Sequence, residues 1–316
     1  MTIATDLFRP LPFSQWRSDP QGFADAFGAS FRETGFAVVS GHGLDRTVID
    51  RALDAARAFF ALPDAVKRKY FIEGGAGQRG YTPFGVEIAK GASARDLKEF
   101  WHVGRELPPG HRLRDVMEDN LYVAEIEDWK QATGAFYDAL EAFGQDLLAA
   151  LELHLKLPDG FLRNACHEGN SILRLLHYPA QNDPPAEGSV RAGAHEDINV
   201  ITLLLGAEEA GLQALHRNGS WLSVSPPPDA IVINAGDMLQ RLTNNAIPST
   251  THRVLNPAPE RSRFARYSTP FFLHFRPDFE IKTLESCVTP DNPDRYPEPI
   301  SAQDYLLERL REIGLM

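Results

Sequence analysis

The sequence predicts a mainly β core of the jelly-roll type with α-helices packed around it. From Ser171 onward, short runs rich in Ile, Leu, Val and Phe are separated by Gly, Pro, Asn and Asp, which are turn residues. About eight short strands at this spacing are typical of a double-sheet jelly roll. The runs are 171–178, 200–205, 211–215, 221–224, 230–234, 238–243, 250–255 and 264–275.

The chain before this core is expected to be largely helical. Apolar residues at helical spacing predict a helix over 45–60, which begins at Asp45 and is stopped by Leu62-Pro63. A stripe of aromatic and leucine side chains predicts a long helix over 124–157 that ends at Pro158 and braces a sheet. The other predicted elements are strands at 35–40 and 98–103, helices around 25–32 and 64–70, and a last helix after Ser301, with Asp304 in a capping box.

No internal repeat or low-complexity linker divides the 316 residues, so we expect one structural unit with four regions. These are an N-terminal α/β region (1–120), a bracing helix region (121–170), the β core (171–280) and a C-terminal helical segment (281–316). The glycine-rich stretch 74–91 is expected to be irregular. It contains a G-x-G-x-x-G match at 75–80, but no buried strand precedes the match and no helix follows it, so we reject a dinucleotide site.

Composition excludes several classes of function. The net charge is −11 and no basic stripe is present, which argues against nucleic acid binding. Cys166 and Cys287 form no metal or redox motif. The first ten residues lack the pattern of a signal peptide, and no stretch is apolar enough to span a bilayer. We therefore expect a cytoplasmic protein without a membrane partner, and its oligomeric state stays open.

The main candidate for a functional site is His195 with Asp197. In an extended backbone, two residues two positions apart point to one side, so their side chains could hold a metal together. His252, in a later strand-like run, is the obvious third ligand. Two histidines and one carboxylate form the face that binds Fe(II) in non-haem oxygenases and leaves the other face of the metal open.

A second candidate group lies shortly after His252. Arg266 and Ser268 are two residues apart in a strand-like run, so they share one face. A guanidinium and a hydroxyl are a suitable pair to bind a carboxylate. Because the run 268–273 reads as a buried strand, the arginine in it needs an anion.

These motifs, in this order and spacing, resemble the Fe(II)/2-oxoglutarate-dependent dioxygenases, in particular the isopenicillin N synthase-like group. The similarity covers nearly the whole chain. It rests on the segments 35–43, 59–63, 195–197, 234–237, 252–254 and 266–268. The resemblance implies a double-stranded β-helix, the cupin-like form of the jelly roll.

The resemblance also implies roles for individual residues. His195, Asp197 and His252 would hold the iron. Arg266 and Ser268 would bind the distal carboxylate of 2-oxoglutarate, and no catalytic side chain is expected beyond the metal centre.

Tyr178 matches a tyrosine of the family that helps to hold the co-substrate or the substrate carboxylate. Leu176 stands where many plant members carry asparagine, so the contact near Tyr178 differs from theirs. His42 and Asp237 also match family positions, and we interpret both as structural residues in turns.

The expected reaction is the oxidation of a small organic substrate by O2, with hydroxylation as the favoured outcome and release of succinate and CO2. Three protein ligands leave about three positions on an octahedral Fe(II), enough for a chelating 2-oxo acid and oxygen. The residues 78–87, Phe100, His102 and the region after Phe275 are expected to line the substrate site.

Three alternatives use the same residues. An Fe(II) oxidase of the isopenicillin N synthase type would work without 2-oxoglutarate. A zinc hydrolase would need Glu196 as its base, but adjacent strand residues point to opposite faces, so Glu196 should face away from the metal. A non-enzymatic 2-oxoglutarate sensor would keep Arg266 and Ser268 but would not need all three metal ligands.

Overall fold

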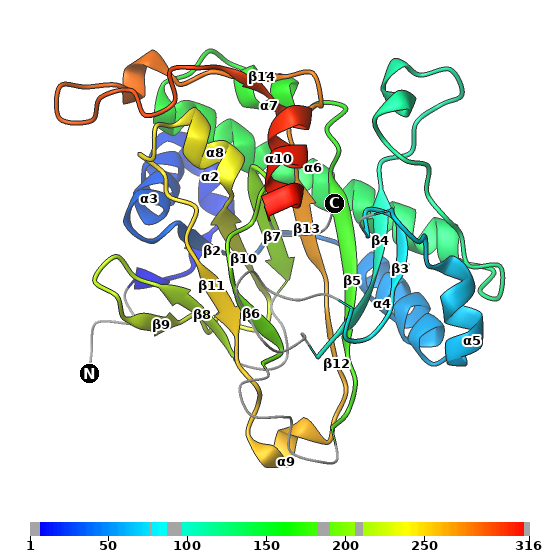
Figure 1. Ribbon diagram of the computed structural model, residues 1–316. Helices are drawn as coiled ribbons and strands as arrows, with labels where there is room; N and C mark the ends of the chain where they lie inside the picture. Colours follow the sequence, from blue (N-terminus) through cyan, green and yellow to red (C-terminus); the bar gives the residue numbers. More distant parts are fainter. Residues whose placement is uncertain (1–6, 76, 87–96, 182–189, 206–210, 313–316) are drawn as a thin grey trace.

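Two β-sheets form the centre of the molecule, and helices cover one side of the larger sheet (Figure 1). The computed structural model describes residues 7–75, 77–86, 97–181, 190–205 and 211–312. Within these residues the arrangement is the predicted double-stranded β-helix with flanking helices. Its two sheets bring segments that are far apart in the sequence together at one site.

The larger sheet contains nine strands, and all pairs in it are antiparallel except β1 with β2. Its order is β1 (Leu11–Pro12), β2 (Phe36–Ser40), β10 (Ala230–Ala235), β7 (Ile201–Leu205), β13 (Pro270–Leu273), β5 (Ile172–Tyr178), β4 (Glu99–Gly104) and β3 (Gly80–Thr82), with β12 (Arg266–Ser268) also paired to β5. Most of these strands are buried almost throughout. On β2 and β10, for example, one face packs in the core under the helices and the other packs against the smaller sheet.

The smaller sheet carries two of the candidate metal ligands. It contains four antiparallel strands in the order β6 (Ala192–His195), β11 (His252–Val254), β8 (Leu212–Leu215) and β9 (Trp221–Ser223). In the register of β6 and β11, His195 and His252 are direct partners. A two-stranded sheet of β14 (Glu280–Ile281) and β15 (Ile300–Ser301) lies in the C-terminal segment.

Three helices form the main cover of the larger sheet. They are α3 (Pro20–Thr34), α4 (Arg46–Phe60) and α6 (Trp129–Leu155), whose side chains share one apolar core with Leu173, Leu203 and Leu273 of the sheet. The remaining helical segments are α2 (Ser14–Ser18), α5 (Asp64–Lys67), η1 (Arg68–Tyr70), η2 (Arg112–Asp115), α7 (Phe161–Cys166), α8 (Asp237–Leu242), α9 (Pro259–Ser262), η3 (Glu285–Cys287) and α10 (Ala302–Glu312). No helix in these parts of the chain has both the length and the apolar character needed to cross a membrane.

The predicted helix ends are largely confirmed. Asp45 caps α4 by accepting a hydrogen bond from the Thr47 amide at 2.8 Å. The Ser301 hydroxyl oxygen accepts one from the Asp304 amide at 3.0 Å, as the capping box requires. The helix α6 begins at Trp129, five residues later than predicted, and ends at the left-handed Lys156, two residues before Pro158.

Two predictions in the β core are wrong. Residues 238–243 were predicted as a strand, but 237–242 form α8, where Met238, Leu239 and Leu242 are buried on one helical face. The short apolar run fits the spacing of a helix as well as that of a strand, and the acidic Asp237 in the first turn favours the helix.

The run 264–275 contains two strands instead of one. The glycine-rich stretch also contains a strand, β3, although part of the stretch lies outside the described residues.

A buried polar network ties the N-terminal region to the sheet. Glu99 of β4 accepts hydrogen bonds from Lys67 Nζ at 2.7 Å and from the Tyr81 hydroxyl, and it contacts His177 Nδ1 at 2.7 Å. Burial raises the pKa of Glu99, but these partners more than offset the effect and hold its pKa below 4.5. The carboxylate is therefore ionised at neutral pH, and its stabilisation is lost only as the pH falls through the lowered pKa.

We expect Lys67→Met to destabilise the fold. The substitution leaves the Glu99 carboxylate buried without its cation, and breaking a buried ion pair costs about 3–5 kcal/mol. A melting temperature lower by roughly 5–10 °C is the expected result in thermal unfolding. Arg46→Met, which breaks the exposed pair with Asp50, is the control and should change the melting temperature by about 1 °C or less. Equal effects of the two substitutions would contradict the prediction.

Candidate active site

His195, Asp197 and His252 lie together in the structure, as predicted. The Nε2 atoms of His195 and His252 are 3.8 Å and 3.9 Å from Asp197 Oδ1, and the two ring centroids are 4.4 Å apart. The histidines belong to paired strands, whereas Asp197 lies two residues after the end of β6. This is the only group of three metal-binding side chains within the described residues.

The geometry of the three side chains fits a metal ion. Ligands at about 2.0–2.2 Å from a metal lie about 3 Å apart when they occupy neighbouring positions. The observed separations are within 1 Å of this value, a difference that small side-chain rotations can close. Two imidazole nitrogens and one carboxylate oxygen are the ligand set of the facial site that binds Fe(II).

Main-chain carbonyl groups orient both rings. The Nδ1 atom of His195 lies 2.7 Å from the Gly193 oxygen, and that of His252 lies 3.1 Å from the Thr250 oxygen. Because a carbonyl oxygen only accepts hydrogen bonds, each Nδ1 carries the proton and each Nε2 keeps its lone pair for a metal. Burial and the neighbouring His252 lower the pKa of His195 to about 4, so this ring is neutral at neutral pH.

Asp197 is held so that one carboxylate oxygen is directed to the histidines. Its other oxygen, Oδ2, accepts hydrogen bonds from Thr202 Oγ1 at 2.5 Å and from Asn234 Nδ2 at 2.8 Å. Burial raises the pKa of Asp197, but the two histidines and these two hydrogen bonds outweigh the effect and lower it below 3.8. The carboxylate is therefore ionised, as metal binding requires.

We expect Thr202→Val to lower metal affinity by about 10- to 100-fold, because partners that orient a ligand contribute about this much. Equilibrium titration with Fe(II) under anaerobic conditions measures the change. Thr202→Ser keeps the hydroxyl and should retain most of the affinity. Thr243→Val removes another buried hydroxyl, one that donates to the Leu239 oxygen within α8, and should leave affinity unchanged. Unchanged metal affinity in Thr202→Val would contradict this role.

Glu196 lies outside the group of ligands, as predicted from its position. Its side chain is exposed and accepts a hydrogen bond from the Thr251 hydroxyl at 2.7 Å. The structure thus offers no support for Glu196 as the base of a zinc hydrolase.

The residues predicted to bind a carboxylate also lie together. Arg266 and Ser268 of β12 are register partners of Tyr178 and Leu176 of β5, and the Arg266 guanidinium is 5.5 Å from the centre of the Tyr178 ring. All four side chains are buried. Arg191, which belongs to none of the predicted motifs, also lies over the Tyr178 ring at 5.4 Å.

The two groups lie on the same face of the larger sheet, which we call the inner face. Thr202 is the register partner of Asn234 on one side and of Phe272 on the other, and all three point away from the apolar core under the helices. Alternation along β12 and β13 puts Arg266, Ser268 and Phe272 on one face. The inner face therefore carries both the residues that hold Asp197 and the residues predicted to bind 2-oxoglutarate.

The two family positions interpreted as structural do lie in supporting contacts. His42 Nδ1 accepts a hydrogen bond from the Leu44 amide in a turn. Asp237 was predicted in a turn, but it is the first residue of α8; it is buried, and its Oδ2 lies 3.1 Å from Arg309 Nε of α10. The Asp237 amide also donates to the Asp197 carbonyl at 2.7 Å, so this pair links the last helix to the backbone of the metal-binding segment.

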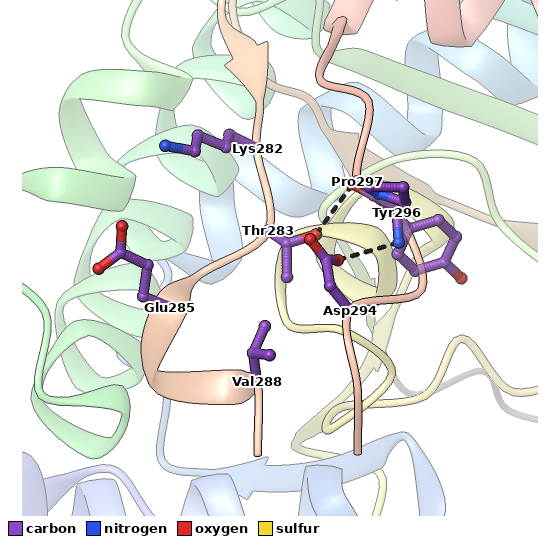
Figure 2. Close-up of a pocket in the computed structure, with 7 residues that line it drawn as sticks. All are labelled: Lys282, Thr283, Glu285, Val288, Asp294, Tyr296 and Pro297. Atoms are coloured by element: carbon purple, nitrogen blue, oxygen red, sulfur yellow. Dashed lines mark hydrogen bonds between the residues drawn. The ribbon is translucent and has the colours of Figure 1, made fainter. Parts of the chain in front are cut away.

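A surface pocket in the C-terminal segment has a different character (Figure 2). Lys282 and Glu285 lie on one side of it, and Asp294 and Tyr296 lie on the other. Asp294 accepts a hydrogen bond from the Tyr296 amide at 3.0 Å. The lining carries charges of both signs and includes none of the candidate metal ligands, so we assign it no role in the reaction.

Comparison with known proteins agrees with this site. Residues 10–125 match the family described as non-haem dioxygenase in morphine synthesis N-terminal, and residues 169–275 match the 2OG-Fe(II) oxygenase superfamily. The 2-oxoglutarate-Fe(II) type oxidoreductase hxnY of Emericella nidulans is 34% identical over 279 residues, which cover 85% of this chain and 78% of the relative.

Two solved structures are similar over nearly their whole length. A 2OG-Fe(II) oxygenase family protein from Caulobacter crescentus is 55% identical, with a TM-score of 0.91 and coverage of 97% of this chain and 99% of that chain. A full-length Neurospora crassa protein, solved in complex with alpha-KG, which is 2-oxoglutarate, is 28% identical, with a TM-score of 0.85 and coverage of 96% of each chain.

A β core that brings two strand histidines together with an aspartate just after a strand has the ligand set of the non-haem Fe(II) oxygenases. The chain belongs to the 2OG-Fe(II) oxygenase superfamily. It is a 2-oxoglutarate-dependent dioxygenase, an oxidoreductase that uses Fe(II) and 2-oxoglutarate. The predicted enzyme class and cofactors are therefore confirmed.

Proposed function

We propose that His195, Asp197 and His252 hold the Fe(II) through the two Nε2 atoms and Asp197 Oδ1. The observation that carries this proposal is the convergence of the three ligand atoms, with the second atom of each side chain already held by a hydrogen bond. When bound, the iron supplies the oxidative chemistry that decarboxylates 2-oxoglutarate and oxidises a C–H bond. The protein orients the ligands and keeps Asp197 ionised.

We further propose that Arg266, Ser268 and Tyr178 bind 2-oxoglutarate. A buried guanidinium and a hydroxyl on adjacent inward positions of β12 suit the distal carboxylate, because such charge-assisted hydrogen bonds are strong. The guanidinium groups of Arg266 and Arg191 both contact the Tyr178 ring, at 5.5 Å and 5.4 Å from its centre, and would hold it beside the carboxylate. The inner face between these residues and Asp197 would carry the reacting end of the co-substrate.

The reaction that we propose is the hydroxylation of a small organic molecule, with the chain as a member of the isopenicillin N synthase-like group. The similar Neurospora crassa protein has also been solved with alpha-KG and thymine, which supports a small substrate.

We also propose that the four regions 1–120, 121–170, 171–280 and 281–316 act as one structural unit. Two buried free cysteines support the proposal of a cytoplasmic location.

The test is the release of succinate by purified protein supplied with Fe(II), O2 and 2-oxoglutarate. We expect slow release without a substrate and faster release when a substrate is added. Protein treated with a chelator is the control and should release none. An Fe(II)-bound protein that releases no succinate would contradict the proposal, and oxygen uptake without consumption of 2-oxoglutarate would indicate the oxidase alternative instead.

A further inference from the structure

We propose that Arg174, set between Phe100, Phe272 and His102 on the inner face, binds the carboxylate of the substrate, so that the enzyme oxidises a small carboxylic acid. This inference rests on the proposed function and names the class of substrate. It assigns a second carboxylate-binding arginine, separate from the one proposed for 2-oxoglutarate.

The Arg174 guanidinium is fixed by aromatic rings from two neighbouring strands. It lies 4.3 Å from the centre of the Phe100 ring on β4 and 5.1 Å from the centre of the Phe272 ring on β13. A cation over an aromatic ring is attracted to it, by about 0.5–2 kcal/mol according to its exposure. Two such contacts hold the charged group in one orientation.

His102 fixes the guanidinium further. It is the register partner of Arg174 on β4, and its Nε2 lies 2.5 Å from Arg174 Nε. The other ring nitrogen, Nδ1, lies 2.5 Å from the Gly77 carbonyl oxygen, which can only accept a hydrogen bond. His102 therefore carries its proton on Nδ1 and accepts from Arg174 through Nε2, so the imidazole positions the arginine without competing for an anion.

The register of the strands puts this group beside the metal-binding residues. Phe272 is the direct partner of Thr202, whose hydroxyl holds Asp197. Arg174 on β5 contacts the ring of Phe272 on β13. Only β13 therefore separates Arg174 from β7, which carries Thr202. A molecule bound to Arg174 would thus be able to reach toward the three proposed metal ligands.

The site differs from the one proposed for 2-oxoglutarate. Arg174 and Tyr178 both lie on the inner face of β5. They are four residues apart, so their Cα atoms are separated by about 13 Å. Leu176 lies between them and packs with Phe100 and Tyr178 in a small apolar cluster. A dicarboxylate as short as 2-oxoglutarate, already held at the iron and at Arg266, would not need Arg174.

The chemistry of the group selects an acid. An arginine that stacks on rings keeps its N–H groups in the guanidinium plane, where two parallel hydrogen bonds can form with a carboxylate. The rings of Phe100 and Phe272 offer apolar contact to the remainder of such a molecule. The combination is suited to a small acid with an apolar or aromatic body.

The test uses the protein loaded with Zn(II), which has no redox chemistry, and saturated with 2-oxoglutarate. The probes are small acids, each paired with its neutral amide, such as benzoate with benzamide, phenylacetate with phenylacetamide and cinnamate with cinnamamide. Thermal shift identifies binders and calorimetric titration gives their affinity. We expect at least one acid to bind and its amide to bind much more weakly.

Substitutions connect that binding to Arg174. Arg174→Gln should weaken the binding of the acid by at least about 30-fold. Arg174→Lys keeps the charge but not the planar guanidinium, so it should retain part of the affinity. Arg241→Gln is the matched control, because Arg241 also lies over two aromatic rings, those of Tyr296 and Tyr305 in the C-terminal part. It should leave acid binding unchanged. The affinity for 2-oxoglutarate should be the same in all of these variants.

Three results would overturn the inference: no acid binds, the amides bind as well as the acids, or Arg174→Gln binds the acid like the unaltered protein. A failure of the proposed function is distinguished by succinate release from the Fe(II) form with 2-oxoglutarate alone. If that release is present and no acid binds, only the assignment of the substrate class fails.

Discussion

His252→Ala is expected to lose both Fe(II) binding and turnover while the protein keeps its fold. His252 supplies one of three proposed ligands, and no other metal-binding side chain in the described residues is placed to replace it. Because the loss of a partner that merely orients a ligand costs about 10- to 100-fold in metal affinity, the loss of the ligand should exceed about 100-fold. Anaerobic titration with Fe(II) and succinate release measure the two effects.

The control for this prediction is His216→Ala. His216 follows β8 and lies 3.8 Å from Glu33, outside the group of ligands, so its loss should leave iron binding unchanged. His195→Ala should behave like His252→Ala. Circular dichroism should give the same secondary structure for all three variants, since none of the substitutions removes a hydrogen bond between two main-chain groups. Full activity in either ligand variant would exclude the proposed metal site.

The class of fold could be predicted from the sequence because two patterns of apolar residues occur in different parts of the chain. One is the spacing of a helix, and the other is the short apolar run of a strand. The helices α4 and α6 bury one stripe of side chains at helical spacing. Most strands of the core follow as short apolar runs between turn residues. The prediction failed at α8, where six residues are too few to distinguish the helical period from that of a strand.

The convergence of the three candidate metal ligands could be predicted because two of them are close in sequence and all three have a characteristic chemistry. The role of Arg174 could not be predicted from the sequence, because it depends on which side chains of the neighbouring strands lie next to it. Only the register shows that Arg174 adjoins His102 and that Phe272 adjoins Thr202. A polar residue in an otherwise apolar strand, such as Thr202 in β7, is the one signal in the sequence that would have indicated a residue supporting the site.

Arg266→Ala is expected to raise the concentration of 2-oxoglutarate needed for half-maximal rate by at least about 30-fold, since the loss of a buried, hydrogen-bonded charge partner costs about 2–5 kcal/mol. Arg266 is 7% exposed, so water cannot take over its role easily. Iron binding should be unchanged, because Arg266 is on β12 and all three ligand atoms come from elsewhere. Succinate release at increasing concentrations of 2-oxoglutarate measures the effect.

Arg263→Ala is the matched control, because Arg263 is an exposed arginine three residues earlier in the chain. Its half-maximal concentration should equal that of the unaltered protein. The half-maximal concentration for Arg266→Lys should lie between those of Arg266→Ala and Arg263→Ala, because an ammonium keeps the charge but cannot form two parallel hydrogen bonds with a carboxylate. If Arg266→Ala leaves the requirement for 2-oxoglutarate unchanged, Arg266 does not bind the co-substrate, and the inner face must hold it through other residues, of which Arg191 beside Tyr178 is the nearest candidate.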